Sequence, residues 1–190
     1  MFILGILIIM LSLPNFSFAN SIISWDEGSV IHEYTLFQAS RIDWDTARSS
    51  AKALGSNWDL ATITSAVEQD FVNSKVIGSL DDGEYWAGGY QPPIYSTPDA
   101  NWHWVTGEQW AYANWDLGSG EPNDYNGLGS ESYLAVNWNG GHWNDEGDRS
   151  GIAGFLAEST HSVPEPSTLL LLGSGLIGLV GYGRKRLFNR

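Results

Sequence analysis

The spacing of apolar residues changes character at Gly78. Before it, one helix face is marked by apolar residues at helical spacing: Trp44, Ala47, Ala51 and Leu54. This pattern predicts a helix over about 43–54. A second helix is expected over about 65–77, because Ser65 and Glu68 have the spacing of a capping box. Beyond Gly78 the helical period does not return, so the rest of the chain must fold by other means.

That second half alternates short strand-like segments with stretches rich in Gly, Asn, Asp and Pro. The expected strands are 32–38, 84–90, 102–105, 132–138 and 152–158, with a short apolar stretch at 60–63. Two helices and a strand-and-loop half predict an α+β fold. The segment 107–130 is a long irregular loop, which favours a loop held by something other than backbone ladders, such as a metal ion.

The charge balance excludes several classes of protein. The chain has 9 basic and 22 acidic residues and no cysteine. Such an excess of acid is unsuited to the phosphate backbone of nucleic acid, and it favours divalent cations as partners. Without cysteine, a disulfide scaffold, a thiolate zinc site and a cysteine nucleophile are excluded. Apolar core and bound metal must therefore supply the stability of the fold.

The first 19 residues are typical of a signal peptide. They begin with an uncharged apolar run and end in Ser17-Phe18-Ala19, the small-x-small pattern of a cleavage site. The alternative is a buried helix, but no polar residue recurs there at helical spacing. We expect export across the inner membrane, with 20–162 as the exported domain.

The last 28 residues contain three parts in a fixed order. Pro164-Glu165-Pro166 precedes an apolar run over 169–182, and Arg184-Lys185-Arg186 follows. The apolar run is short for a membrane core of about 30 Å, which favours a transient anchor over a permanent single span. The arrangement resembles the bacterial PEP-CTERM sorting signal. This resemblance implies that an exosortase-type processing enzyme recognises 163–190 at the inner membrane and that the domain reaches the cell surface or an exopolysaccharide matrix.

Acidic and amide side chains gather in and after the long loop. Glu121-Pro122-Asn123-Asp124 lies within it, Glu131 follows, and Trp143-Asn144-Asp145 comes next. Flexible loops with carboxylate and amide oxygens suit calcium (Ca2+). A cis peptide bond at Pro122 would let both neighbouring side chains point toward one ion. Each motif alone is also a good turn sequence, so their joint occurrence carries the argument.

A set of short motifs occurs in a fixed order between Tyr34 and Glu158. It comprises Trp44-x-x-Ala47, Leu60–Ile63, Glu68–Val72, Tyr85–Gly89, Trp102–Gly107, Asn114-Trp115, Glu121-Pro122-Asn123, Trp143-Asn144-Asp145 and Gly154–Glu158. This order resembles the C-type lectin-like domain. The resemblance implies an α+β fold in which two helices pack on antiparallel sheets beside a long calcium-binding loop region.

The same resemblance implies a ligand set and a function. The principal calcium ion would be held by Glu121, Asn123, Glu131, Asn144 and Asp145, and the same ion and side chains would bind vicinal hydroxyls of a glycan or exopolysaccharide. The Glu-Pro-Asn order implies a mannose- or glucose-type preference. Asp124 could bind an auxiliary calcium, and Glu68 with Glu158 a further one, although a helix-capping role is favoured for Glu68. Ala51, Ala157 and Tyr133 stand where the family usually has cysteine, so we expect the loop to be mobile without calcium.

Other interpretations are weaker. His32, His103, His142 and His161 have no zinc-motif spacing, so none is expected to bind zinc. Most tryptophans are expected in the core, with sugar stacking as the alternative role. Glu121 and Glu131 could act as a glycosidase pair, but their metal-like company disfavours an enzyme. The remaining alternative is a non-catalytic matrix or adhesion protein that uses the same fold to bind protein without sugar recognition.

Overall fold

The computed structural model describes residues 17–78, 83–147 and 149–163. The elements are β1 (Ser17–Asp26), β2 (Val30–Gln38), α1 (Trp44–Lys52), β3 (Trp58–Leu60), α2 (Ala66–Phe71), the π-helix η1 (Val72–Ile77), β4 (Glu84–Tyr90), β5 (His103–Trp104), β6 (Tyr133–Trp138), β7 (His142–Glu146) and β8 (Ile152–Ser162). The strands of this part form one eight-stranded sheet in which the hydrogen-bonded path is β1-β2-β8-β4-β6-β7. β3 pairs with β8, and β5 pairs with β4.

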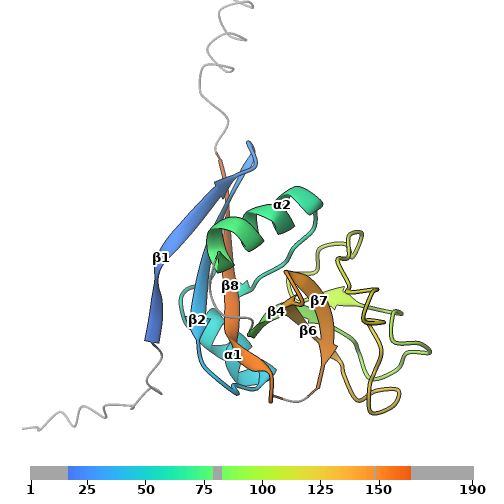
Figure 1. Cartoon of the computed structure of the whole chain (residues 1–190). Coiled ribbons are helices and arrows are strands. Elements are labelled where there is room, and N and C mark those ends of the chain that lie inside the picture. Colours follow the sequence, from blue (N-terminus) through green and yellow to red (C-terminus); the bar gives the residue numbers. More distant parts are fainter. Residues whose placement is uncertain (1–16, 79–82, 148, 164–190) are drawn as a thin grey trace, which may run out of the picture.

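The second and the last strand of the domain are neighbours. β2 pairs antiparallel with β8 along its whole length, from Val30 opposite Ser162 to Gln38 opposite Gly154. They run side by side through the centre of Figure 1. The sequence predicted antiparallel sheets, but β4 and β8 pair parallel, so the sheet is mixed. The long β8 therefore joins the helical half to the half that contains β4, β6 and β7.

Both helices begin at side-chain caps, and the cap at Ser65 was predicted. The Asp43 side chain accepts a hydrogen bond from the backbone N–H of Thr46, and α1 starts one residue after Asp43. Ser65 caps α2 by accepting from the N–H of Glu68. The predicted second helix is confirmed in extent, but its second half winds as the π-helix η1. Hydrophobic spacing does not distinguish these two windings, because the difference lies in the backbone hydrogen bonds.

Two packed clusters of buried side chains form the core. One is rich in aromatic residues of β4, β5 and β7 and includes Trp102, Trp104 and Trp143, all at most 4 % exposed. The other lies between α1 and the sheet and includes Trp44 and Trp86. The expectation that most tryptophans build the core is confirmed, because these five are buried and Trp110 and Trp115 pack against the first cluster.

The second cluster also contains the positions where the resemblance expects a disulfide. Ala51 of α1 and Ala157 of β8 are both fully buried there. Close packing extends to Gly154, where an added Cβ would clash with the carbonyl oxygen of Phe37 on the paired strand. The chain therefore joins α1 to β8 by apolar contact, with no covalent cross-link.

Most strand predictions are confirmed, and two elements were not foreseen. The segments predicted at 32–38, 84–90 and 132–138 correspond to β2, β4 and β6 within two residues. β7 was missed because its polar sequence was interpreted only as a loop motif. β1 was missed because Ser17–Ala19, its first residues, were assigned to the signal peptide. Residues 1–16 and the sorting tail after Val163 lie outside the described part, so the predicted domain limits stay predictions.

Candidate functional site

The long loop between β5 and β6 is held mainly through side chains. Within 107–130 the structure has no helix or extended strand, and the backbone pairs with the sheet only through a bridge between Trp115 and Trp143. This loop-rich half lies to the right in Figure 1, on the side of the domain away from β1. The sequence prediction of a long irregular loop is confirmed.

Asp116 organises the first part of this loop. Its carboxylate accepts hydrogen bonds from Ser119 Oγ at 2.6 Å, from the Asn139 amide at 2.8 Å and from the backbone N–H of Gly118 at 3.1 Å. These bonds, the Ser119 hydroxyl first, lower the pKa of Asp116 to about 2. The backbone carbonyl of Asp116 also accepts from the N–H of Glu121 at 3.0 Å. Asp116 therefore remains ionised, and its backbone carbonyl fixes the position of the Glu121 backbone.

Asp145 of β7 holds the Glu121–Asp124 segment against the sheet. It is fully buried, and its Oδ1 and Oδ2 accept hydrogen bonds from the backbone N–H groups of Asn123 and Asp124, both at 2.8 Å. The peptide bond between Glu121 and Pro122 is cis, as the sequence analysis considered. The structure thus joins the two acidic motifs, which are more than 20 residues apart in the chain.

Glu121 and Asp145 are in direct contact. Their side chains share a hydrogen bond, and Glu121 is only 6 % exposed. Burial first, then this bond and the charges of Asp145, Glu131 and Asp116, raise the pKa of Glu121 to about 8. Burial also raises the pKa of Asp145. Two carboxyl groups in this position require either a shared proton or a cation between them.

Three buried oxygens around this pair have no hydrogen-bond partner in the described part of the chain. They are Glu121 Oε2, Asn123 Oδ1 and Asp124 Oδ2. A buried acceptor without a partner costs about 1–3 kcal/mol, so three within four residues is unusual. Carboxylate and amide oxygens on a loop are the donors that calcium takes. The residues present therefore fit a calcium ion.

Glu131 lies close to this group. Its Oε2 accepts from the backbone N–H of Tyr125 at 2.7 Å, and its own N–H donates to Asp124 Oδ1 at 2.9 Å. Its charge also contributes to the raised pKa of Glu121. Tyr95 donates a hydrogen bond to the same Asp124 oxygen at 3.3 Å. Asp124, which the sequence offered as an auxiliary calcium ligand, is thus tied to the loop by one oxygen and carries a second that has no partner.

Asn144 is placed differently from the other predicted ligands. Its amide nitrogen donates to Glu84 Oε1 at 3.0 Å and to Glu146 Oε1 at 3.2 Å. Successive side chains of a strand point to opposite faces, so Asn144 projects from the other face of β7 than Asp145. The structure brings Glu121, Asn123 and Asp145 together with Glu131 near them. A ligand role for Asn144 stays a prediction.

Sequence reasoning did not find Asp116 or Tyr95. For Asp116 a local signal existed, because Asp116-Leu117-Gly118-Ser119 is a favourable sequence for a turn in which the carboxylate binds nearby backbone N–H groups. For Tyr95 there was none, because its contact with Asp124 joins two loops that are 29 residues apart.

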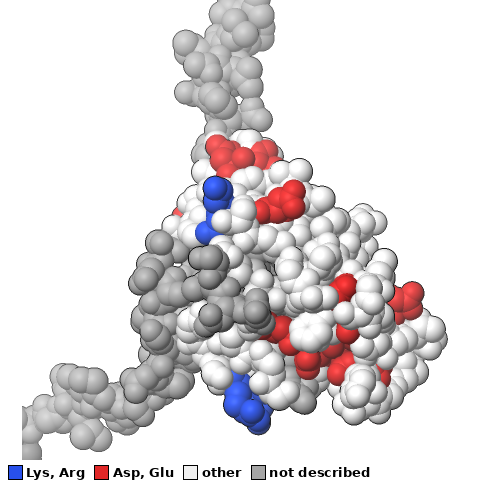
Figure 2. All heavy atoms as spheres, viewed as in Figure 1, with Lys and Arg blue, Asp and Glu red and all other residues white. Residues whose placement is uncertain are grey.

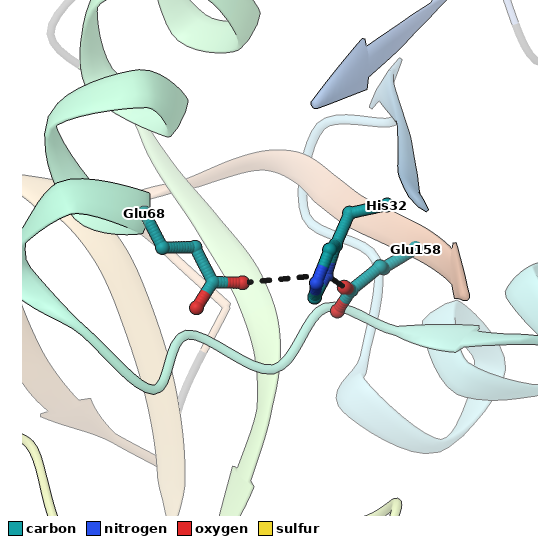
Figure 3. A group of neighbouring side chains, drawn as sticks. All are labelled: His32, Glu68 and Glu158. Carbon is teal, nitrogen blue, oxygen red and sulfur yellow. Dashed lines mark hydrogen bonds and ion pairs between the residues drawn. The ribbon is translucent and has the colours of Figure 1, made fainter. Parts of the chain in front are cut away.

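A second cluster joins the two residues predicted as a weaker metal site. Glu68 of α2 and Glu158 of β8 approach one another at His32 of β2, as Figure 3 shows. A helix-capping role was favoured for Glu68. Its carboxylate does bind a backbone N–H at the start of α2, but that of Thr64, at 2.7 Å, one residue before the N-cap Ser65. Glu68 is only 1 % exposed. The structure brings Glu68 and Glu158 together and adds His32, which has no zinc-motif spacing in the sequence. The further calcium site at Glu68 and Glu158 stays a prediction.

The surface around the loop is acidic. Figure 2 shows carboxylate side chains over the loop-rich half and, as a second group, over the upper end of the domain near α2, whereas the few basic side chains on this face are separated from one another. Within 20–162 there are five basic and 21 acidic residues. This distribution attracts cations to the loop side of the domain.

No helix of the described residues is both long enough and apolar enough to cross a membrane. The apolar run predicted as a transient anchor lies outside these residues. The motif model described as "PEP-CTERM protein-sorting motif" matches residues 162–186. No curated protein matches the chain in sequence.

Known structures show which fold this is. The C-type lectin CEL-I from Cucumaria echinata superposes with a TM-score of 0.57 at 24 % identity, and the match covers 74 % of this chain and 96 % of that one. The carbohydrate-recognition domain of the mouse scavenger receptor C-type lectin gives 0.54 at 19 %, covering 67 % and 89 %. Human lithostathine gives 0.52 at 20 %, covering 74 % and 97 %. The chain therefore has the C-type lectin-like fold and carries a PEP-CTERM sorting motif of the bacterial exosortase system at its C-terminus.

Proposed function

We propose that this protein is a calcium-dependent carbohydrate-binding protein of the bacterial surface or exopolysaccharide matrix. The observation that carries the proposal is the group of buried oxygens at Glu121, Asn123 and Asp124, which face no hydrogen-bond donor beside the Glu121–Asp145 carboxyl pair. The C-type lectin-like fold and the sorting motif support it.

A bound calcium ion would supply positive charge and open coordination positions for two neighbouring sugar hydroxyls. The chain's own residues would then set the orientation of the sugar. Glu121 and Glu131 offer acceptors for hydroxyl protons, and the Asn123 amide offers a donor. Asp145 and Asp116 keep this loop in place through the backbone N–H groups that they bind. Sugar hydroxyls replace ordered water at such a site, so little hydrogen bonding is lost on binding.

The proposed sugar class is the mannose and glucose type. It rests on the Glu-Pro-Asn order at 121–123, which in similar lectins accompanies that hydroxyl geometry. Contact with one sugar through a shallow site is weak, so useful binding requires several copies of the domain or a polymeric glycan. The exopolysaccharide of a bacterial matrix is such a polymer, and the sorting tail at 163–190 would deliver the domain to it.

A glycan array tests the proposal directly. The full chain is applied in calcium buffer and again with a chelator, and we expect mannose- and glucose-type signals that vanish with the chelator. Soluble mannose should compete and galactose should compete at least ten-fold less well. A glycan signal that persists with the chelator would refute the calcium dependence, and no glycan signal together with capture of a protein would support the adhesion alternative instead.

Glu121→Gln provides the matching variant. It keeps the size of the side chain but removes one charge beside Asp145, so calcium affinity should fall at least ten-fold in titration calorimetry. Asp70→Asn is the control, because Asp70 is an exposed acid of α2 and loses the same charge. Equal calcium affinity in both variants would refute the ligand assignment.

A further inference from the structure

We propose that His32, Glu68 and Glu158 form a zinc-class metal site, separate from the calcium site of the loop. The three side chains come from β2, α2 and β8, and each offers one ligand atom within 4.8 Å of the others. Figure 3 shows both carboxylates directed toward the imidazole. At most 7 % of each residue is exposed.

The imidazole presents one nitrogen to both acids. His32 Nδ1 lies 2.6 Å from Glu158 Oε1 and 3.8 Å from Glu68 Oε1. Ligand atoms about 2.0–2.2 Å from a tetrahedral zinc ion are roughly 3.4 Å apart, so each of these two distances would have to change by less than about 1 Å. The hydroxyl of Tyr34 lies 3.4 Å from His32 Nδ1 and donates to Glu68 Oε1 at 2.6 Å. It stands close to where a fourth ligand or a bound water would be.

Each carboxylate is anchored by its other oxygen. Glu158 Oε2 accepts from the backbone N–H of Thr62 at 2.8 Å, and Glu68 Oε2 accepts from Thr64 N–H at 2.7 Å and from its hydroxyl at 3.1 Å. In both residues the remaining oxygen, Oε1, is the one turned to His32. Metal sites use such outer hydrogen bonds to orient their ligands.

The second imidazole nitrogen lies near a carboxylate that could orient a metal-bound histidine. His32 Nε2 is buried without a well-formed hydrogen bond, and the nearest carboxylate oxygen is Glu27 Oε2 at 3.4 Å. The ring is held from the side by Trp25, whose ring centroid is 4.9 Å away. A carboxylate, a histidine and a metal in line are a recurrent arrangement in zinc proteins.

The donor set selects a zinc-class ion over calcium. Calcium takes six to eight oxygen ligands, whereas this buried site offers one nitrogen, two carboxylates and one hydroxyl. Zinc accepts nitrogen and oxygen donors in a four-coordinate site. A neutral imidazole and two carboxylates carry two negative charges, which match a divalent ion.

The test is a zinc titration of the full chain without a histidine tag. Zinc chloride is present during refolding, because the ligands are buried, and bound metal and melting temperature are measured. We expect one tightly bound zinc per chain and a higher melting temperature. His32→Gln should bind zinc at least ten-fold more weakly. His161→Gln is the matched control, because His161 is an exposed histidine of β8 that pairs with Glu33. It should bind zinc like the unmodified chain.

Two further measurements keep the outcome decisive if His32→Gln does not fold. Cobalt(II) bound to the unmodified chain should give the strong visible absorption of a tetrahedral ion. Glu27→Gln changes a half-exposed side chain and should weaken zinc binding several-fold while circular dichroism is unchanged. Zinc binding that is absent, or equal in His32→Gln and His161→Gln, would overturn the proposal. Calcium binding at this site that is equally strong in the unmodified chain and in His32→Gln would also overturn the proposal. The two proposals can fail separately, because they concern different residues. Glu121→Gln should bind zinc like the unmodified chain, and a chain that binds no zinc could still bind glycan through calcium.

Discussion

The two halves of the domain are stabilised by different interactions. The half built on β2, β8 and the helices is held by continuous strand pairing and by apolar side chains packed against α1 and η1. The loop-rich half around 107–130 packs Trp110 and Trp115 on the aromatic cluster and is otherwise held by carboxylates that bind backbone N–H groups, chiefly Asp116 and Asp145. One half therefore depends on strand pairing and apolar burial, and the other depends in addition on buried charge.

This difference separates scaffold from ligand site. In the loop half, side chains that fix the fold lie beside oxygens that have no partner, so folding and cation binding involve the same residues. In the sheet half, His32, Glu68 and Glu158 lie where three elements meet, and the surrounding packing fixes them without any ion. Cation removal should then affect the halves unequally.

The largest effect is expected where the halves meet. Trp143 is fully buried, its ring packs edge-on against Trp104 and Trp115, and its Nε1 donates to Gln69 Oε1 at 2.6 Å. Trp143→Ala should lower the free energy of unfolding by about 3–5 kcal/mol, measured by urea denaturation. Tyr125→Ala, in an exposed loop position, should change it by less than about 0.5 kcal/mol. Similar losses in both variants would contradict this description of the core.

Calcium should stabilise the loop half and leave the sheet half almost unchanged. At a concentration 100-fold above its dissociation constant, a ligand that binds only the folded state adds about 2.7 kcal/mol. Hydrogen exchange with calcium and with chelator measures where that stabilisation appears. We expect slower exchange at 107–130 and little change in β2 and β8. Uniform protection of both halves would show that they do not behave as separate units.

Asp145→Ala should disturb the loop more than the sheet. The change leaves the backbone N–H groups of Asn123 and Asp124 without their acceptor, which costs about 1–3 kcal/mol each where the groups stay buried. The loss of these contacts should loosen the loop. Limited proteolysis should cut the variant within 107–130 and spare the sheet. Asp145→Asn keeps one acceptor and should be cut more slowly.

The smallest effect concerns the cap of α1. The N–H of Thr46 lowers the pKa of the Asp43 carboxyl below 3.8, so the ionised cap stabilises the fold above about pH 4 and loses this contribution as the pH falls through the lowered value. Asp43→Ala should cost about 1 kcal/mol at pH 7. Asp43→Asn should keep the cap and remove this part of the acid dependence. Thermal melting of the three proteins from pH 6 to pH 2.5 measures it, and parallel curves for all three would contradict the assignment.

The sequence predicted the scaffold better than the site. The apolar spacing from Trp44 gave the start of the first helix and Ser65 that of the second, because apolar spacing and caps are local signals. The sequence did not predict η1 as a π-helix, because a π-helix shares its apolar spacing with an α-helix. It did not predict β7, because Asn144 and Asp145 lack the apolar alternation of a strand.

For the site, the sequence identified residues but could not give their contacts. Glu121, Asn123 and Asp145 were expected together through a resemblance, and the structure joins them. The hydrogen bonds of Asn144 to Glu84 could not be foreseen, because 60 residues separate the pair. The same holds for His32, which meets Glu158 across 126 residues without any zinc spacing in the chain.

The alanines at 51 and 157 have a consequence for where such a domain can work. Because apolar side chains pack α1 against β8 and the chain has no cysteine, no disulfide can form or break in it. The domain needs no thiol oxidase to fold, and its stability does not depend on the thiol–disulfide balance of the compartment in which it works.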